Sequence, residues 1–171
     1  MNVIWRLSTI VLIVGAAACG RTPAPESAAS AAASANTDVR QAEHSTYPHV
    51  IAYRSPTCGC CELWVEHMRA AGFKVEIKNT DDIGAIKAEA GVPVGKGSCH
   101  TARVGAYWVE GHVPASDVKR LLAETPDARG LVVPGMVPGS PGMEQGGVTQ
   151  PYDVLLIAKD GSTSVFSHHG T

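Results

Sequence analysis

Three cysteines within four residues, the motif Cys58-Gly59-Cys60-Cys61, constrain the fold of this chain more than any other feature. The motif follows a short apolar run at residues 49–53, which is typical of a β-strand, and precedes residues 62–71, whose apolar side chains recur at helical spacing. The cysteines are therefore predicted to lie between a strand and the N-terminal end of a helix. The unpaired N–H groups and the macrodipole at such an end stabilise anionic sulfur, so we expect these thiols to ionise more readily than free cysteine.

The patterns after the motif predict one α/β domain over residues 47–171, with a mixed sheet and flanking helices. Strands and helices alternate at first, which favours parallel strands, and Asp160-Gly161 predicts a hairpin that ends the sheet with an antiparallel pair. Asp81 or Asp82 is expected to cap a helix that ends at residue 90. The other predicted strands and helices cover residues 73–77, 104–110, 114–124, 154–158 and 162–166.

The N-terminal residues predict export. Residues 1–18 have the layout of a signal peptide, with one basic residue, an apolar stretch and small residues before Cys19. This segment resembles a bacterial lipobox, although Ala16 stands where leucine is usual, and the resemblance implies that Cys19 is lipidated. Simple secretion after cleavage is the alternative. Residues 19–46 are rich in Ala, Ser, Thr and Pro and are predicted to form a flexible tether.

The charge balance argues against nucleic acid as a partner. Lys and Arg number 14 and Asp and Glu number 16, which gives a formal charge of -2. Proteins that bind a phosphate backbone carry a basic patch, and this composition does not predict one.

A fourth thiol, Cys99, lies in a glycine-rich segment that only the fold can bring close to the motif. Residues 131–147 are predicted to form a long loop, and Met136 and Met143 lie in it rather than on an apolar helix face. Thiolates with nearby thioethers select Cu(I). The predicted metal ligands are therefore Cys58, Cys60, Cys61, Cys99, Met136 and Met143.

The spacing of the cysteines favours a cluster over a single ion. The adjacent Cys60 and Cys61 cannot easily bind one tetrahedral ion together with Cys58, so we expect bridging thiolates and a multinuclear copper cluster. Cys58 and Cys61 also have the C-x-x-C spacing of a redox dithiol, which would make them the catalytic pair of an oxidoreductase.

Other interpretations of these residues stay open. The four cysteines of the domain allow three disulfide pairings, and Cys99 could be a disulfide partner. The two methionines could fill the core. His100 and His112 are interpreted as hydrogen-bonding residues, and the pair His168-His169 as a polar tail with at most weak affinity for metal.

The order strand, C-x-x-C, helix, strand, and then Pro151 ahead of residues 154–158, resembles a thioredoxin-type core. In that family the equivalent proline is cis and lies against the dithiol, which assigns this position to Pro151. Residues 92–149 would then be a large insertion before the proline. Residues 53–166 are similar to the CopG-type copper resistance proteins, which are periplasmic or lipid-anchored thioredoxin-like metal-binding domains. The motifs that carry this similarity are Ser55-Pro56-Thr57-Cys58-Gly59-Cys60-Cys61, Ser98-Cys99-His100-Thr101, Glu110-Gly111-His112-Val113-Pro114-Ala115, Gly135-Met136 and Gly142-Met143-Glu144.

The resemblance implies a periplasmic protein of a Gram-negative bacterium that sequesters or handles Cu(I) and contributes to copper resistance. The implied partners are copper ions and other periplasmic copper-resistance proteins, with a lipid anchor as the contact with the membrane. The alternative function is a thiol-disulfide or copper oxidoreductase in which Cys58 attacks and Cys61 resolves.

Overall fold

The computed structural model describes residues 45–170. The predicted signal peptide (residues 1–18), the predicted lipidation site Cys19 and all but the last two residues of the predicted tether (residues 19–46) lie outside this range. In residues 45–170, no helix is long and apolar enough to cross a membrane.

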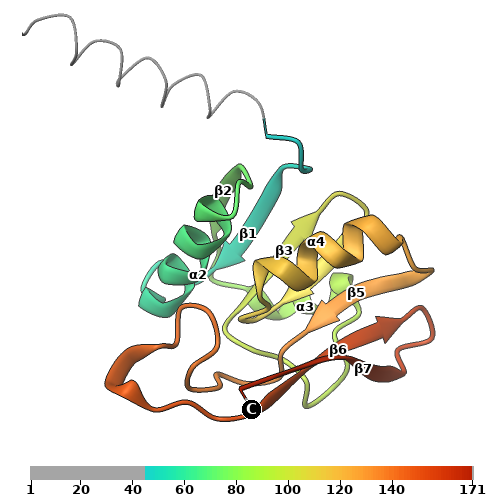
Figure 1. Cartoon of the computed structure of the whole chain (residues 1–171). Coiled ribbons are helices and arrows are strands. Elements are labelled where there is room, and N and C mark those ends of the chain that lie inside the picture. Colours follow the sequence, from blue (N-terminus) through green and yellow to red (C-terminus); the bar gives the residue numbers. More distant parts are fainter. Residues whose placement is uncertain (1–44, 171) are drawn as a thin grey trace, which may run out of the picture. The chain divides into compact units, whose positions relative to one another are not determined.

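The described residues form a mixed sheet with α-helices on both faces, so the prediction of a mixed α/β fold is confirmed (Figure 1). The strand order across the sheet is β2-β1-β3-β4-β5-β6-β7. The pairs β1–β2 and β4–β5 are parallel, and the other neighbouring pairs are antiparallel. The elements are β1 (Val50–Arg54), α2 (Gly59–Ala70), β2 (Val75–Asn79), α3 (Ile83–Ala90), β3 (His100–Val104), β4 (Tyr107–Glu110), α4 (Ala115–Glu124), β5 (Ala128–Val132), the short 3-10 helix η1 (Gln145–Gly147), β6 (Tyr152–Ala158) and β7 (Thr163–His169).

Helices α2 and α3 cover opposite faces of the sheet. Neighbouring residues of a strand point to opposite faces, and His100 and Thr101 are neighbours in β3. The ring of His100 contacts Trp64 of α2, whereas the hydroxyl of Thr101 accepts a hydrogen bond from Lys87 of α3. Residues 98–101 are therefore held between the two helices.

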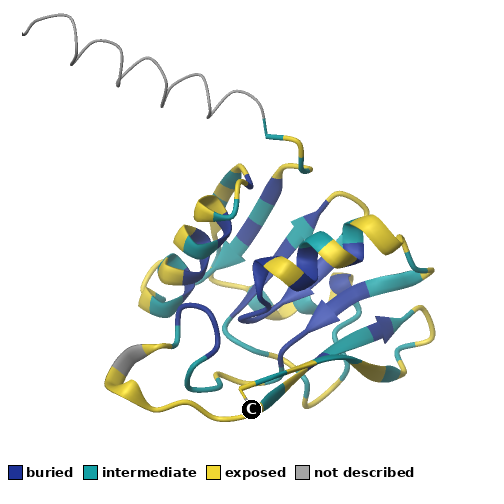
Figure 2. Ribbon diagram, in the orientation of Figure 1, coloured by how far each residue is buried: buried dark blue, intermediate teal, exposed yellow. Residues whose placement is uncertain are grey.

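The hydrophobic core lies between the sheet and the pair α2 and α4, which pack on the same face (Figure 2). Helix α2 buries Trp64 and Met68, and helix α4 buries Val118 and Leu121. The imidazole Nε2 of His67 in α2 accepts a hydrogen bond from the first backbone N–H of α4, at 3.0 Å. This bond replaces a side-chain cap, because the N-terminal residue of α4 follows a proline that offers none.

Local signals place several element ends where the sequence predicted them. The carboxylate of Asp82 accepts a hydrogen bond from the backbone N–H of Ala85 at 3.0 Å and so caps α3. The turn at Asp160 joins β6 to β7, and its carboxylate accepts hydrogen bonds from Ser162. Both signals act within a few residues, which is why sequence alone reveals them.

The segment predicted as an insertion, residues 92–149, supplies the middle of the sheet. A single strand is predicted at residues 104–110, but the chain turns at Gly105 and forms a hairpin of β3 and β4 there. Strand β5, which ends at Val132, extends into the first two residues of the loop predicted at residues 131–147. Strand β5 holds Gly130, where a Cβ would overlap the backbone of Trp108 in β4. Neither strand has the apolar, β-prone sequence that predicts a strand, because β3 contains polar residues and β5 contains a glycine.

Candidate metal centre

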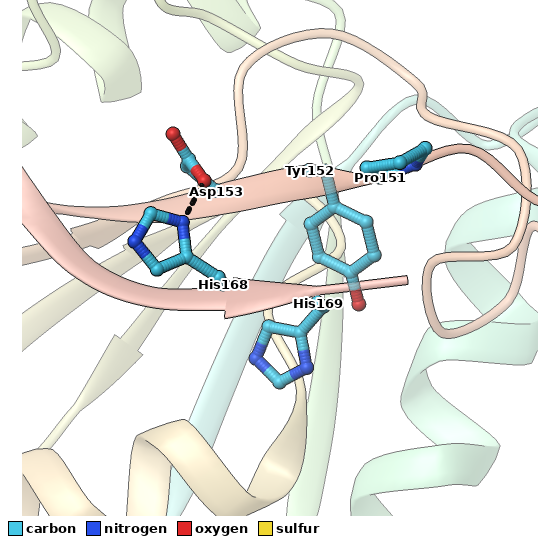
Figure 3. Close-up of a pocket in the computed structure, with 5 residues that line it drawn as sticks. All are labelled: Pro151, Tyr152, Asp153, His168 and His169. Atoms are coloured by element: carbon cyan, nitrogen blue, oxygen red, sulfur yellow. Dashed lines mark hydrogen bonds and ion pairs between the residues drawn. The ribbon is translucent and has the colours of Figure 1, made fainter. Parts of the chain in front are cut away.

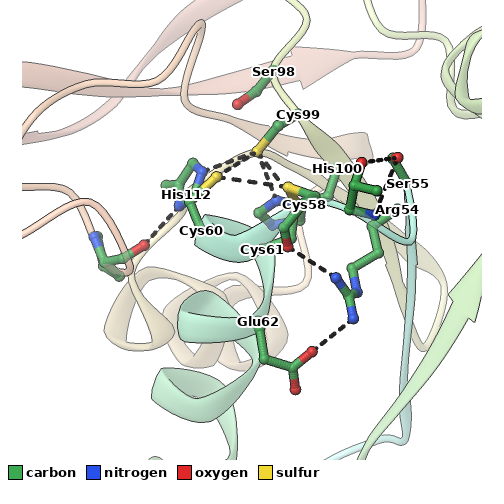
Figure 4. Close-up of a disulfide and its surroundings, with 12 residues drawn as sticks. Arg54, Ser55, Cys58, Cys60, Cys61, Glu62, Ser98, Cys99, His100 and His112 are labelled. Carbon is green, nitrogen blue, oxygen red and sulfur yellow. Dashed lines mark hydrogen bonds and ion pairs between the residues drawn. A yellow bond between two sulfur atoms is a disulfide. The ribbon is translucent and has the colours of Figure 1, made fainter.

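The cysteine motif lies at the N-terminal end of α2, as predicted (Figure 4). Cys58 is the N-cap residue, and Cys60 and Cys61 lie in the first turn. The guanidinium of Arg54, the last residue of β1, donates to the carbonyl oxygen of Cys58 at 2.9 Å and pairs with the carboxylate of Glu62 at 2.7 Å. This ion pair fastens the loop that carries the thiols to the end of β1.

Cys99 joins the motif because β3 pairs antiparallel with β1. The register places His100 opposite Arg54, so Cys99 lies beside the loop that follows β1. The sulfur of Cys99 is 3.5 Å from that of Cys61 and 3.7 Å from that of Cys60. The sulfur of Cys60 is 3.6 Å from that of Cys58. We call Cys58, Cys60, Cys61 and Cys99 the sulfur cluster; their ligand atoms all lie within 4.8 Å of one another.

Two of the four sulfurs are bonded to each other. Cys58 and Cys61 form a disulfide, and their Cα atoms are 5.4 Å apart. In the described part of the chain, Cys60 and Cys99 are free thiols. The interpretation of Cys99 as a disulfide partner therefore does not hold in this structure. Cys61 is buried, whereas Cys58, Cys60 and Cys99 are partly exposed.

Two histidines approach the sulfur cluster from the side of Cys99. The sulfur of Cys99 is 3.1 Å from Nε2 of His112 and 3.3 Å from Nδ1 of His100. The other nitrogen of His112, Nδ1, is 2.8 Å from the carbonyl oxygen of Pro141. A carbonyl oxygen only accepts, so Nδ1 carries the proton and the lone pair of Nε2 faces Cys99. Such a backbone contact orients histidines that bind metals.

Burial controls the protonation of these groups. It lowers the pKa of His100 well below the usual range and also lowers the pKa of His112, so both rings are neutral at pH 7 and can act as ligands. Burial, followed by the nearby Cys60, raises the pKa of Cys99 to about 12. The ready ionisation expected of a thiol at a helix N-terminus therefore does not extend to Cys99, which lies immediately before β3. Without a metal, this thiol keeps its proton at neutral pH.

The two methionines lie beside the cysteine motif, around a cavity of about 610 Å³. The side chain of Met136 is 56% exposed, and Met143 is partly buried. Met136 therefore belongs to the surface rather than to the core, as its place in a Gly- and Pro-rich loop suggested. The cavity is lined by Gly59, Cys60, Leu63, Met136, Pro138 and Met143.

Figure 3 shows Pro151 in a second pocket, and the strand order of the sheet separates this pocket from the sulfur cluster. Pro151 precedes β6, and β3, β4 and β5 separate β6 from β1 in the sheet. The strand that pairs antiparallel with β1 is β3, and the residue immediately before β3 is Cys99. Cys99 therefore stands beside the dithiol, where the resemblance placed a proline. Pro151 instead lines the second pocket with Tyr152, Asp153, His168 and His169.

The histidine pair in that second pocket is divided between two carboxylates. Nδ1 of His168 is 2.6 Å from Asp153, and Nε2 of His169 is 2.6 Å from Asp117 of α4. Consecutive residues in a strand point to opposite faces, so the two imidazoles do not converge on one point. The described residues offer no group of three metal ligands here.

Sequence reasoning underestimated His100 and His112. The structure confirms that both residues form hydrogen bonds, and it adds that both rings lie at Cys99, where they could also hold a metal ion. The available signal was that His100 follows Cys99 directly. For His112 the sequence offered no local signal, because the residue reaches the site through the pairing of β3 with β4.

The donors gathered here are soft or borderline: four sulfurs, two neutral imidazoles and two nearby thioethers. Such a set suits Cu(I) and has too few oxygen donors for magnesium or calcium. The Nδ1 of His100 faces Cys99, and its Nε2 is buried without a hydrogen-bond partner among the described residues. The arrangement can hold a soft metal ion, and its C-x-x-C pair can also exchange electrons.

Three comparisons bear on this site. A family model described as "Protein of unknown function, DUF411" matches residues 96–143, the segment that holds Cys99, both histidines and both methionines. The solved structure "Copper resistance protein copG- Form 2" is 42% identical, has a TM-score of 0.69, and its match covers 72% of this chain and 99% of that one. "Copper resistance protein copG- Form 1" is 41% identical with the same TM-score, over 73% of this chain and 99% of that one. A search of curated proteins found no match.

Proposed function

Because this chain belongs to the CopG family of copper resistance proteins, we propose that it binds Cu(I) through its sulfur cluster and contributes to copper resistance. The observation that carries the proposal is that four cysteine sulfurs converge from two distant segments of the chain. Cys99 lies 38 residues after Cys61 and 39 residues after Cys60 in the sequence. A fold that needed only a disulfide would not require the other two thiols beside it.

Copper is the cargo in this proposal, and each donor has a role. Thiolates of Cys58, Cys60, Cys61 and Cys99 bind the metal, and sulfurs shared between ions give a multinuclear cluster. The lone pair on Nε2 of His112 offers a further ligand at Cys99. Met136 and Met143, beside Cys60, would complete the shell as thioethers.

Full binding requires reduction of the disulfide beforehand and loss of the thiol protons as the metal binds. The Cys58–Cys61 disulfide must take up two electrons and two protons from a dithiol reductant, which yields two thiols and a disulfide in that reductant. Each thiol then loses its proton to solvent as a Cu–S bond forms. Because the pKa of Cys99 is raised to about 12, Cu(I) has to displace this proton at neutral pH, and copper affinity should fall as the pH falls.

The proposal also places the protein in the periplasm, held at the membrane by a lipid on Cys19. Other periplasmic copper-resistance proteins would supply or accept the copper. The sequence pattern at residues 1–19 supports this location. Replacing Cys19 by Ala should move the protein from the membrane fraction to the soluble fraction, and a chain that stays with the membrane would contradict the lipid anchor.

Anaerobic titration of the protein with Cu(I) against a competing chelator tests the main proposal. The reduced protein should bind several equivalents with an affinity far tighter than micromolar. Protein that keeps its Cys58–Cys61 disulfide is the matched control and should bind fewer equivalents, because two thiolates are lost. Micromolar or weaker binding by the reduced protein would overturn the proposal.

A second candidate function is thiol-disulfide exchange, and the Cys58–Cys61 disulfide at a helix N-terminus favours it. The partly exposed Cys58 thiolate would attack a substrate disulfide, release one substrate thiolate and form a mixed disulfide. The Cys61 thiolate would then attack the sulfur of Cys58 and release the second substrate thiolate. Copper is an alternative electron partner: two Cu(II) ions would accept one electron each from the dithiol, which yields two Cu(I) ions, the Cys58–Cys61 disulfide and two protons released to solvent.

Two serine variants separate the functions. Cys58→Ser should abolish exchange with a small disulfide, and unchanged turnover would exclude this function. Cys60→Ser should leave exchange nearly intact and reduce the number of Cu(I) equivalents, because Cys60 lies outside the disulfide but inside the sulfur cluster.

A further inference from the structure

Glu110 is a fully buried carboxylate next to the sulfur cluster, and copper binding does not use it directly. It ends β4, and its side chain is 0% exposed. A carboxylate without partners in such a place would be strongly destabilising, so its contacts reveal what it holds.

The carboxylate of Glu110 accepts hydrogen bonds from residues on both sides of Cys99 in the sequence. One oxygen accepts a hydrogen bond from the backbone N–H of Ser98 at 2.6 Å, and the other accepts from the hydroxyl of Thr101 at 2.6 Å. These two partners stand immediately before Cys99 and two residues after it. A single charged group thus fixes both ends of the short segment that carries the cysteine.

Lys87 contacts both Glu110 and Thr101. Its ammonium group forms an ion pair with Glu110 and donates to the hydroxyl of Thr101 at 3.2 Å. Lys87 belongs to α3, its side chain is 19% exposed, and α3 covers the face of the sheet away from α2. The three side chains form a closed ring in which every charge is paired and the Thr101 hydroxyl both donates and accepts.

We infer that Glu110, held by Lys87, is a positioning residue that sets the distance between the sulfur of Cys99 and the sulfurs at the N-terminus of α2. Charge-assisted hydrogen bonds are short and directional, so they hold the backbone at residues 98–101 more firmly than neutral contacts. The motif is fastened separately by Arg54, so each of the two cysteine-bearing segments has its own ion pair. The inference rests on the proposed function only for the importance of Cys99, since the geometry exists without copper.

The effective concentration of Cys99 toward Cys61 tests this inference without any metal. In the full chain carrying Cys58→Ser and Cys60→Ser, the domain keeps Cys61 and Cys99, whose sulfurs are 3.5 Å apart. Closing this gap to a disulfide needs an approach of about 1.5 Å. Equilibration in a glutathione redox buffer, quenching with an alkylating reagent and mass spectrometry give the fraction with the Cys61–Cys99 bond. That fraction yields the effective concentration.

Glu110→Gln in this background should lower the effective concentration about tenfold or more. The amide NH₂ group of glutamine is itself a donor, so it would face donor groups whose hydrogen bonds the carboxylate accepted. Thr101→Val, which removes one donor and preserves the shape, should lower it by a smaller factor. Lys87→Met combined with Glu110→Gln should cost less than the two single changes multiplied together, because the charges are removed as a pair. Glu124→Gln, at an exposed ion pair on α4, is the control and should change nothing.

A purely structural role would lower the free energy of unfolding but leave the effective concentration of the folded variants unchanged. Effective concentrations within twofold of the parent for Glu110→Gln and Thr101→Val, with native circular dichroism, would overturn the inference. If Glu110→Gln fails to fold, Thr101→Val decides the matter alone. Because the assay contains no copper, its outcome is independent of whether the chain binds Cu(I).

Discussion

Replacing Gly142 by Ala should push the loop that contains Met136 and Met143 away from α2, the helix that carries the cysteine motif. Gly142 has a φ of 84° and packs against the first turns of α2. An added Cβ would lie 2.7 Å from the backbone nitrogen of Trp64 and 2.8 Å from the carbonyl oxygen of Cys60. Both atoms belong to helical backbone, which cannot yield as a flexible side chain would. The loop therefore has to move.

Two contributions set the size of the effect. A left-handed φ costs a residue with a Cβ about 1 kcal/mol relative to glycine. Overpacking against a fixed neighbour adds about 1–3 kcal/mol. We therefore expect Gly142→Ala to lower the free energy of unfolding by about 2–4 kcal/mol.

Gly146 offers a matched control in the same segment. Its φ is 82°, and a Cβ there would meet no atom within 4 Å. Gly146→Ala should therefore show only the conformational contribution of about 1 kcal/mol. Urea unfolding of both variants, with the m-value checked for constancy, isolates the packing contribution as the difference between them. Equal destabilisation of the two variants would refute the contact between the loop and α2.

The same substitution should also weaken copper binding under the proposed function. Pro141 precedes the substituted position, and its carbonyl oxygen orients His112. Met143 follows it and lines the cavity beside Cys60. The Cu(I) affinity of Gly142→Ala should fall below that of Gly146→Ala, measured by the same chelator competition.

Three further substitutions or conditions test the fold around the site. Trp64→Phe removes the buried indole N–H that donates to the carbonyl oxygen of Val113 at 2.9 Å, and should cost about 1–3 kcal/mol in urea unfolding; a cost near zero would contradict this bond. Burial lowers the pKa of His67, whose Nε2 accepts from the N–H of Ala115, so the unfolded chain binds a proton more readily. The free energy of unfolding should therefore fall as the pH drops below about 6.5, and His67→Gln should weaken that dependence in urea titrations at pH 7.5 and 5.5. Gly130→Ala would drive a Cβ into the backbone of β4, so it should give little soluble protein, and normal yields with native circular dichroism would contradict the strand pairing.

Local signals in the sequence determined the framework of this protein. The cysteine motif between an apolar run and an amphipathic segment predicted thiols at a helix N-terminus, and Cys58 is the N-cap of α2. Asp82 predicted a helix cap, and Asp160-Gly161 predicted the last hairpin. Each signal depends on interactions over a few residues, which backbone geometry dictates whatever the rest of the chain does.

Only the tertiary structure decided which distant residues complete the site. Cys99 reaches the motif through the pairing of β3 with β1, and His112 follows from the pairing of β3 with β4. Pro151, which the order of motifs assigned to the site, lies beyond three intervening strands. Strand order is a property of the whole sheet, and residues distant in sequence become neighbours only when their strands pair. The buried charge of Glu110 is likewise paired with Lys87 of α3, a contact between distant residues that no local pattern encodes.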